Sequence, residues 1–198
     1  MLYYSTYSME NLTDAQLITL YIEGNHKAFD GLINRHSQAV YRFTFKLLNN
    51  SDEAHDVTQE TFIKAWKNIK KFDHDKNFKT WIFSIARNAA YDKLRKKKSV
   101  SFSSLDEEEN EFDANIPDDQ LLPHEIFEQN EKIELVRKAL EAIPFDQKTA
   151  VLLHHGEEMT FEEISEVVDK PMNTVKSQYR RALISLKKLI EDQNAPKA

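Results

Sequence analysis

Basic and hydroxyl side chains gather near the C-terminus, over residues 173–188, which contain five Lys or Arg and no acid. Apolar residues at helical spacing predict the inward face of a helix here: Val175, Tyr179, Ala182 and Leu186. The opposite face then carries the groups that could bind DNA: Lys176, Ser177, Arg180 and Arg181.

The surrounding segment, residues 160–186, predicts a short helix, a tight turn and a longer helix, which is the layout of a helix-turn-helix. Arg can make a bidentate contact with guanine, whereas Lys and Ser bind phosphates. The alternative interpretation is an ordinary helical hairpin whose basic face is only solvated. The pattern by itself leaves both open.

Aromatic and basic side chains alternate over residues 70–98. This mixture suits single-stranded nucleic acid, because each base stacked on a ring contributes about 1–3 kcal/mol. The competing interpretation is that Phe78 and Trp81, which lie at helical spacing, belong to the core. The spacing does not decide between the two.

An acidic cluster is the strongest candidate for a metal site: Asp52, Glu53, Asp56 and Glu60. Hard cations need convergent carboxylates, whereas acids in the first turn of a helix are already explained by the helix dipole. The seven histidines show no HExxH spacing. We therefore predict no metal, no cofactor and no catalytic residue, and a metal-dependent hydrolase lacks its ligands.

The composition excludes several other classes. The chain has 198 residues, of which 40% are apolar, and no cysteine, so disulfides and thiolate zinc sites are excluded. Its three glycines are isolated, so neither common nucleotide-binding loop can form. No uninterrupted apolar run exceeds four residues, which predicts a cytoplasmic protein without membrane insertion.

The charges are segregated along the chain, although the net charge is −6. Residues 64–98 contain twelve Lys or Arg against three acids, whereas residues 99–124 contain eight acids and no Lys or Arg. A local basic stripe is the feature expected of a nucleic-acid-binding surface. The acidic stretch, which has little periodicity, is predicted to be a mobile linker.

Helical periodicity and capping residues predict an all-α chain of two small domains. In the first domain, Thr13 opens a short helix, and three longer helices follow over about 29–47, 52–69 and 78–98, with Trp66 available for the core. In the second, Asn173 or Thr174 is expected to cap the final helix. The predicted boundaries are 1–11 for an N-terminal extension, 12–98 and 125–192 for the domains, 99–124 for the linker and 193–198 for a tail.

Three motifs carry a family resemblance: residues 52–66 (DEAHDVTQETFIKAW), residues 78–88 (FKTWIFSIARN) followed by 92–95 (DKLR), and residues 171–177 (PMNTVKS). In this order the chain resembles a bacterial RNA polymerase sigma factor of the extracytoplasmic-function group of the sigma-70 family. The similarity extends from about residue 12 to residue 190. It implies one domain that binds polymerase and melts the −10 promoter element, and a second that recognises the −35 element.

The resemblance assigns three sets of residues. Those that bind the polymerase are Asp52, Glu53, Asp56, Gln59, Glu60, Phe62 and Lys64. Those that bind the −10 element are Lys76, Asn77, Lys79, Trp81, Arg87, Asn88, Tyr91 and Arg95, with the loop Phe72–Asn77 capturing a flipped base. Those that bind the −35 element are Asn173, Thr174, Lys176, Ser177, Arg180 and Arg181, with Asn173 standing where many relatives have glycine.

We therefore expect a transcription initiation factor that performs no covalent chemistry. The partners implied by the resemblance are the clamp helices and flap of core RNA polymerase, promoter DNA that is double-stranded at −35 and single-stranded at −10, and an anti-sigma factor. The competing hypothesis is a helix-turn-helix regulator that acts without polymerase, but it leaves the motifs at 52–66 and 78–95 unexplained.

Overall fold

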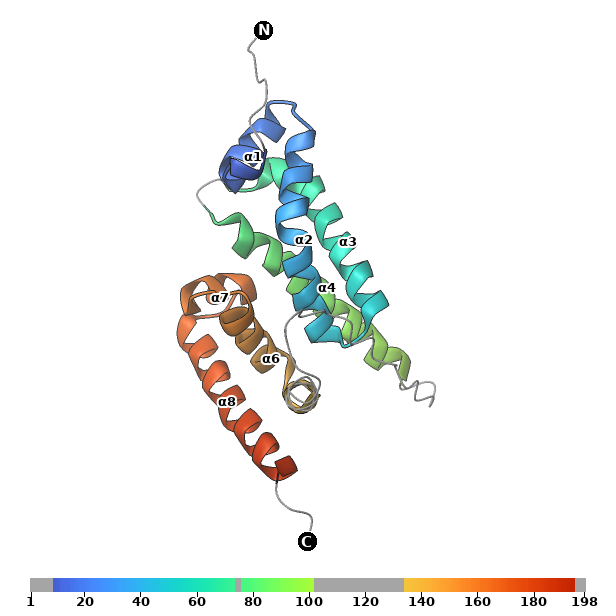
Figure 1. Cartoon of the computed structure of the whole chain (residues 1–198), viewed down its shortest axis with the longest axis vertical. Helices are drawn as coiled ribbons and strands as arrows, with labels where there is room; N and C mark the ends of the chain where they lie inside the picture. Colours follow the sequence, from blue (N-terminus) through green and yellow to red (C-terminus); the bar gives the residue numbers. More distant parts are fainter. Residues whose placement is uncertain (1–8, 74–75, 102–133, 195–198) are drawn as a thin grey trace, which may run out of the picture.

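The computed structural model describes residues 9–73, 76–101 and 134–194, and within these ranges it contains helices and no strand (Figure 1). The all-α prediction is confirmed for this part of the chain. The first domain consists of η1 (Met9–Asn11), α1 (Asp14–Ile22), α2 (Lys27–Leu48), α3 (Ser51–Asn68), η2 (Ile69–Lys71) and α4 (Phe78–Ser101). Most of the predicted linker, from residue 102 on, lies outside the described residues.

Side-chain caps define the ends of these helices. The Thr13 hydroxyl accepts from the backbone N–H of Gln16 at 3.3 Å, and Gln16 Oε1 accepts from the backbone N–H of Thr13 at 2.8 Å, which confirms the predicted capping box at α1. Asn49 ends α2 in the left-handed conformation, with φ 51°. Asn50 then caps α3 by accepting from the backbone N–H of Glu53 at 2.8 Å.

The core of the first domain lies where α2, α3 and α4 pack on one another. Phe43 of α2 and Phe83 of α4 are buried, with ring centroids 5.2 Å apart. On α3 the buried residues are mostly small: Ala54, Val57, Thr61, Phe62 and Ala65. The expectation that Trp66 lies in the core is wrong, because its side chain is 52% exposed.

The second domain is a smaller group of helices. Residues 134–141 are helical, and they are followed by α6 (Phe145–Val151), the π-helical turn η3 (Leu152–Gly156), α7 (Phe161–Val168) and α8 (Met172–Asn194). Its core includes Ile164 and Val167 of α7 with Val175 and Ala182 of α8. The predicted capping box at Thr160 and Glu163 is confirmed at the start of α7.

The turn between α7 and α8 differs from the prediction by about two residues. Asp169 adopts the left-handed conformation with φ 51°, and Lys170 and Pro171 complete the turn. The Pro171 carbonyl already accepts from the backbone N–H groups of Thr174 and Val175, at 2.8 and 3.2 Å. Helix α8 therefore begins at Met172, and the expectation that Asn173 or Thr174 precedes it as the cap is wrong.

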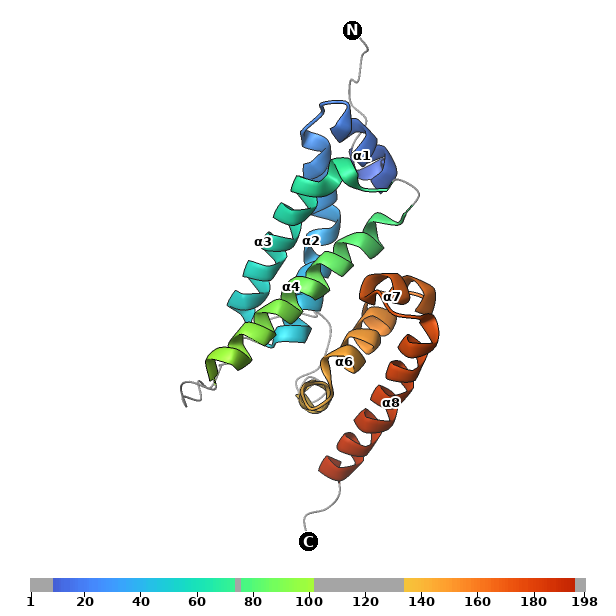
Figure 2. The ribbon, with the colours of Figure 1, turned by 180° about the vertical axis from the view of Figure 1, so that it is seen from behind.

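Helix α4 lies between the two domains. On one side it packs on α2 and α3, and on the other it packs along α7, an arrangement visible from both sides of the molecule (Figures 1 and 2). Buried residues of both domains consequently form one continuous apolar cluster. The placement of α4 decides which of its side chains remain available to other molecules.

Candidate nucleic-acid interface

Helix α8 presents its basic residues on the face opposite its buried side chains. Val175 and Ala182 are 3% and 0% exposed, as the apolar spacing predicts. The candidate −35 residues that the structure leaves exposed are Asn173, Lys176, Ser177, Arg180 and Arg181, while Thr174 is half-buried. Within the described parts of the chain, no acidic side chain forms an ion pair with Arg180 or Arg181.

Aromatic contacts hold α8 against the preceding turn. The His154 ring stacks on Phe161 with centroids 4.7 Å apart, and His154 Nδ1 lies 2.9 Å from the Met159 carbonyl oxygen. His155 Nε2 lies 2.8 Å from the Tyr179 hydroxyl on α8. The spacing of these histidines does not fit a metal site, so the sequence predicts no functional role for them. The structure assigns them to the positioning of the basic helix.

The basic residues of α4 are in a different situation, because most are already in contact with other side chains. Arg87 donates to Asp146 at 2.7 Å, Lys93 Nζ lies 3.3 Å from Asp56 Oδ2, and Arg95 forms an ion pair with Asp92. Asn88 and Tyr91 are exposed on the same helix. The helix is thus basic in sequence but partly neutralised in the structure.

The aromatic residues at the start of α4 form a cluster. The Trp81 ring lies 4.8 Å from the Phe72 ring and 5.7 Å from the Phe78 ring, between centroids. Phe72 and Phe78 are buried, whereas Trp81 is only half-buried and lines a shallow groove with Lys64, Asn68, Lys71 and Ile85. The core interpretation therefore holds for Phe78, and Trp81 combines core contacts with a solvent-facing edge.

A cavity of about 370 Å³ lies between α1 and the start of α4. Its lining includes Phe72, Lys76, Asn77 and Phe78 on one side and Thr13, Asp14, Ala15, Ile18 and Arg35 on the other. Lys76 is exposed, and Asn77 Oδ1 accepts from the backbone N–H of Lys79 at 2.8 Å. Of the predicted base-capturing loop, Phe72, Lys76 and Asn77 therefore border a cavity whose walls are both aromatic and polar.

Asp14 and Arg35 form an ion pair in the wall of this cavity. Burial alone would raise the pKa of Asp14, but the hydrogen bonds and charges of His36 and Arg35 outweigh it and hold that pKa below its usual value. Asp14 Oδ1 accepts from Arg35 at 2.5 Å, and Asp14 Oδ2 lies 2.7 Å from His36 Nε2. The carboxylate is thus ionised and oriented at neutral pH.

Helix α3 carries the predicted polymerase-binding residues. The exposed members of the set are Asp52, Asp56, Gln59, Glu60 and Lys64, while Glu53 is half-buried. Phe62 is the exception, because it is 7% exposed and packs in the core; it supports the helix from within. Ile63 and Trp66, which sequence analysis did not place on a surface, are 51% and 52% exposed on α3.

The described residues contain neither a metal-binding cluster nor a membrane-spanning helix. No group of three or more His, Cys, Asp or Glu side chains is arranged to hold a metal ion in this part of the chain. Among the described helices, none has the length and apolar character needed to cross a membrane.

Comparison with known families assigns both halves of the chain. Residues 32–100 match the model described as Sigma-70 region 2, and residues 133–186 match the model described as Sigma-70, region 4. The first match covers most of α2 and all of α3, and the second covers the helix-turn-helix. A regulator that uses only the helix-turn-helix would leave the region 2 match without explanation.

Individual relatives are similar over nearly their whole length. The ECF RNA polymerase sigma factor SigW of Bacillus subtilis is 29% identical over 173 residues, which cover 86% of this chain and 92% of that protein. The ECF RNA polymerase sigma-E factor of Haemophilus influenzae is 31% identical over 196 residues, which cover 94% and 98%.

Two solved structures share the fold. The sigma factor RpoE from Bartonella quintana, solved with the anti-sigma factor NepR, matches with a TM-score of 0.69 and 25% identity over 83% of this chain and 98% of that one. CnrH, solved with the cytosolic domain of CnrY, matches with a TM-score of 0.68 and 21% identity over 90% and 97%.

Proposed function

Because the chain belongs to the extracytoplasmic-function group of the sigma-70 family of RNA polymerase sigma factors, we propose that its surfaces divide promoter recognition as follows. As a member of this family, the chain is a non-catalytic polymerase subunit that recognises promoters. Core RNA polymerase is its partner and forms the bonds of the transcript. Recognition is therefore a matter of binding free energy and not of catalytic residues.

Helix α8 binds the −35 element in the major groove. The support is the exposed N-terminal half of the helix, where Arg180 and Arg181 are accompanied by Lys176 and Ser177. A guanidinium can hydrogen-bond guanine O6 and N7 together, and Lys and Ser fix the register through phosphates. The N-terminal amides of the helix add to the phosphate site.

The first domain captures unpaired bases of the −10 element. A flipped base needs a pocket with a surface for stacking and with polar groups for its edge. The cavity beside α4 offers aromatic walls from Phe72 and Phe78, and polar groups from Asp14 and Lys76. Asn88 and Tyr91, which are exposed further along α4, would contact the adjoining strand.

Helix α3 docks on the clamp of the polymerase. Gln59 and Glu60 are exposed there, and Ile63 and Trp66 add apolar surface to the same helix. Aromatic residues are frequent among the side chains that contribute most to binding. An exposed face of this composition is more typical of a stable subunit interface than of a helix face that contacts only solvent.

The observation that carries the proposal is the exposed basic half of α8. Val175 and Ala182 are buried on the opposite side of the same helix. The test is run-off transcription with purified core polymerase and a promoter of this protein. Added wild-type protein should yield promoter-specific transcripts. A protein that binds the promoter DNA but yields no transcript with core polymerase would contradict the proposal.

An anti-sigma factor is a further proposed partner. The similar sigma factor RpoE was solved with the anti-sigma factor NepR, and by analogy this chain is held inactive by a protein of that class. We also place the chain in the cytoplasm, where the polymerase is. Co-purification of the chain with a specific inhibitory protein that blocks its binding to core polymerase would test the partner.

A further inference from the structure

Two adjacent histidines lie beside the basic half of α8. His154 and His155 belong to the π-helical turn η3, and turns of this kind are frequent at functional sites. Their ring centroids are 5.1 Å apart, and they lie 5.0 and 5.7 Å from the ring centroid of Tyr179 on α8. We call these two side chains the histidine pair. Besides holding α8 in position, the pair brings two titratable groups to the edge of the proposed −35 surface.

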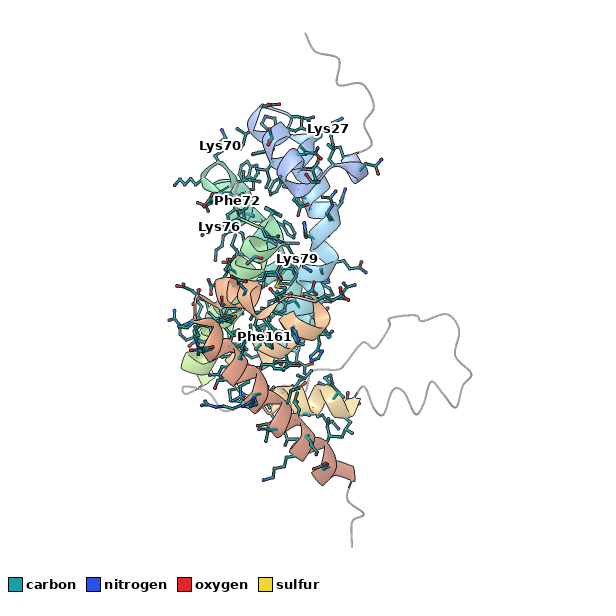
Figure 3. The ribbon with its side chains drawn as sticks, turned by 90° about the vertical axis from the view of Figure 1, so that its left-hand side faces the viewer. Lys27, Lys70, Phe72, Lys76, Lys79 and Phe161 are labelled. Atoms are coloured by element: carbon teal, nitrogen blue, oxygen red, sulfur yellow. The ribbon has the colours of Figure 1, made fainter. Side chains whose placement is uncertain are left out.

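The ring of Phe161 connects the histidine pair to a cation that is proposed to bind a DNA phosphate. The His154 ring stacks on Phe161 with centroids 4.7 Å apart, and Lys176 Nζ lies 5.9 Å from the centroid of the same ring. Figure 3 shows Phe161 near the upper end of α8, where its ring is 5.2 Å from that of Tyr179. The pair and Lys176 therefore share one edge of the domain, and a DNA strand that contacts one of them passes near the other.

A backbone hydrogen bond determines where His154 carries its protons. His154 Nδ1 lies 2.9 Å from the Met159 carbonyl oxygen. Because a carbonyl oxygen only accepts, Nδ1 carries the hydrogen of the neutral ring, and Nε2 gains one only when the ring becomes positively charged. The acceptor is itself held in place, since Glu158 adopts the left-handed conformation with φ 56° and the Met159 N–H donates to the Leu153 carbonyl at 3.1 Å. His154 can therefore donate from Nε2 to an anion only as imidazolium.

His155 is the more accessible member of the pair. It is exposed, and its Nε2 lies 2.8 Å from the Tyr179 hydroxyl. A hydroxyl can donate or accept, so this hydrogen bond is compatible with the neutral and the charged ring. Among the described residues, none forms a hydrogen bond with His155 Nδ1. That nitrogen is available to a group from another molecule.

The acids closest to the pair along the chain are engaged elsewhere or exposed. The Glu157 carboxylate is buried and lies 3.9 Å from Lys79 Nζ, and the Glu163 carboxylate accepts from Thr160 in the capping box. The other charged groups near the turn are Glu158 on the turn itself, Arg42 and Lys46 on α2, Asp146 and Lys148 on α6, Glu162 on α7, and Lys176 and Arg180 on α8. Within the described ranges, no carboxylate forms an ion pair with either imidazole. A proton on the pair is therefore left for an anion from outside the chain.

We propose that the protonated histidine pair binds a phosphate of the −35 duplex beside the one bound by Lys176, so that promoter binding tightens as the pH falls. The inference rests on the proposed function of α8 and adds a pH-dependent contact to it. Histidine is the side chain whose ordinary charge change falls between about pH 5 and 8. The contact is therefore partial at neutral pH, whereas contacts made by Arg or Lys are constant there.

The first test measures the affinity of the chain, in complex with core polymerase, for a −35 duplex at about pH 8 and about pH 6. His154→Gln combined with His155→Gln keeps side chains that can hydrogen-bond but that stay neutral at both pH values. The ratio of wild-type to variant affinity should rise about fivefold between the two, as for an exposed ion pair at the strong end of its range. The dependence of log K on log salt should also be steeper by about one for the wild type at the lower pH.

A second variant supplies the charge permanently. His155→Arg should bind at about pH 8 nearly as tightly as the wild type does at about pH 6, and should lose most of the pH dependence. His26→Gln, which removes an exposed histidine of the first domain, is the matched control and should keep the dependence of the wild type. Thermal melts at both pH values report whether each variant is folded. If the double variant melts early, His155→Gln alone gives the same comparison at an exposed position.

The outcomes separate this proposal from the one on which it rests. An affinity ratio of wild type to double variant that is the same at both pH values would overturn it, because a purely positioning role of the histidines predicts an equal loss throughout. Retention of the pH dependence by the double variant would overturn it as well. If instead Arg180→Ala leaves the −35 affinity unchanged at both pH values, the proposed function of α8 fails.

Discussion

On α8 the guanidinium groups of Arg180 and Arg181 are exposed, whereas on α4 the guanidinium of Arg87 is held by Asp146 of the other domain. Both helices are basic, and both have apolar residues on the opposite side. They differ in whether acidic side chains lie close enough to pair with these arginines. The cations of α8 are therefore open to solvent, whereas Arg87 of α4 already has a carboxylate partner within the chain.

This difference matches the order of events at a promoter. Duplex recognition needs no change in the DNA, so a surface that is always exposed is suitable. Capture of unpaired bases contributes free energy only after the strands separate.

The largest expected effect is the loss of binding to core polymerase. Gln59→Ala combined with Glu60→Ala should abolish binding to core polymerase, because both side chains are exposed on the proposed docking face. The free energy of unfolding should change by less than about 1 kcal/mol, as for surface substitutions. Pull-down with core polymerase would measure the binding, and denaturation in urea would measure the free energy of unfolding.

The matched control is Glu23→Ala, an exposed acid outside that face. Polymerase binding that survives the double substitution would show that the docking face lies elsewhere.

The next effect tests the exposed surface alone. Arg180→Ala should weaken binding to the −35 duplex by about 1–3 kcal/mol and relax the preference for one base pair, if the side chain contacts a base. Lys176→Ala should weaken all sequences alike and lower the salt dependence. Titrations with a set of single-base promoter variants distinguish the two patterns, and Lys187→Ala on the same helix is the control. Uniform weakening by Arg180→Ala would make it a phosphate contact.

A smaller effect is expected from Asn88, which is exposed on α4 next to Arg87. Asn88→Ala should reduce transcription from a fully paired promoter by about fivefold, equivalent to roughly 1 kcal/mol, because Asn88 is exposed and is proposed to contact only unpaired bases. A promoter with a pre-opened −10 bubble should be spared. Permanganate reactivity of the −10 thymines would locate the defect. Normal opening with this variant would assign strand capture to other residues.

The exposed surface could be predicted from sequence because it depends on local periodicity. Val175 and Ala182 mark the inward side of α8, and the cations fall on the other side without reference to any other segment. The same reasoning fails at Trp66, because a large apolar side chain at helical spacing predicts a core position there, whereas the structure exposes it. The small residues Ala54 and Ala65, at helical spacing with Val57, mark the buried side of α3 and would have placed Trp66 outside it.

The surroundings of Arg87 could not be predicted in this way. Arg87 and Asp146 are 59 positions apart, and no local pattern connects them. The sequence shows that α4 is basic, but the pairing of its cations is a property of how the domains pack. The cavity beside α4 has the same origin, because Asp14 and Phe78 come together only through the packing of α1 on α2 and of α2 on α4.

The smallest effect concerns the Glu157 carboxylate, which lies at the junction of the domains. Burial raises the pKa of Glu157 above its ordinary value of 4.5, although electrostatic interactions with Lys79, Arg42, Lys46 and His36 oppose the shift. Because the folded chain binds this proton more tightly than the unfolded chain does, ionised Glu157 lowers the stability at neutral pH. The stability should then rise as the pH falls through the raised pKa toward 4.5.

Glu157→Gln should therefore increase Tm at pH 7, by less than about 4 °C for a single contact in a chain of this size. The difference from the wild type should shrink as the pH approaches 4.5. The hydrogen bond from Lys79 survives, because it is donated to the backbone carbonyl. Calorimetry at several pH values, with Glu166→Gln as the exposed control, measures the effect. A lower Tm of Glu157→Gln than of the wild type at pH 7, with a deficit that shrinks as the pH falls, would instead mean that the ionised carboxylate stabilises the fold through Lys79.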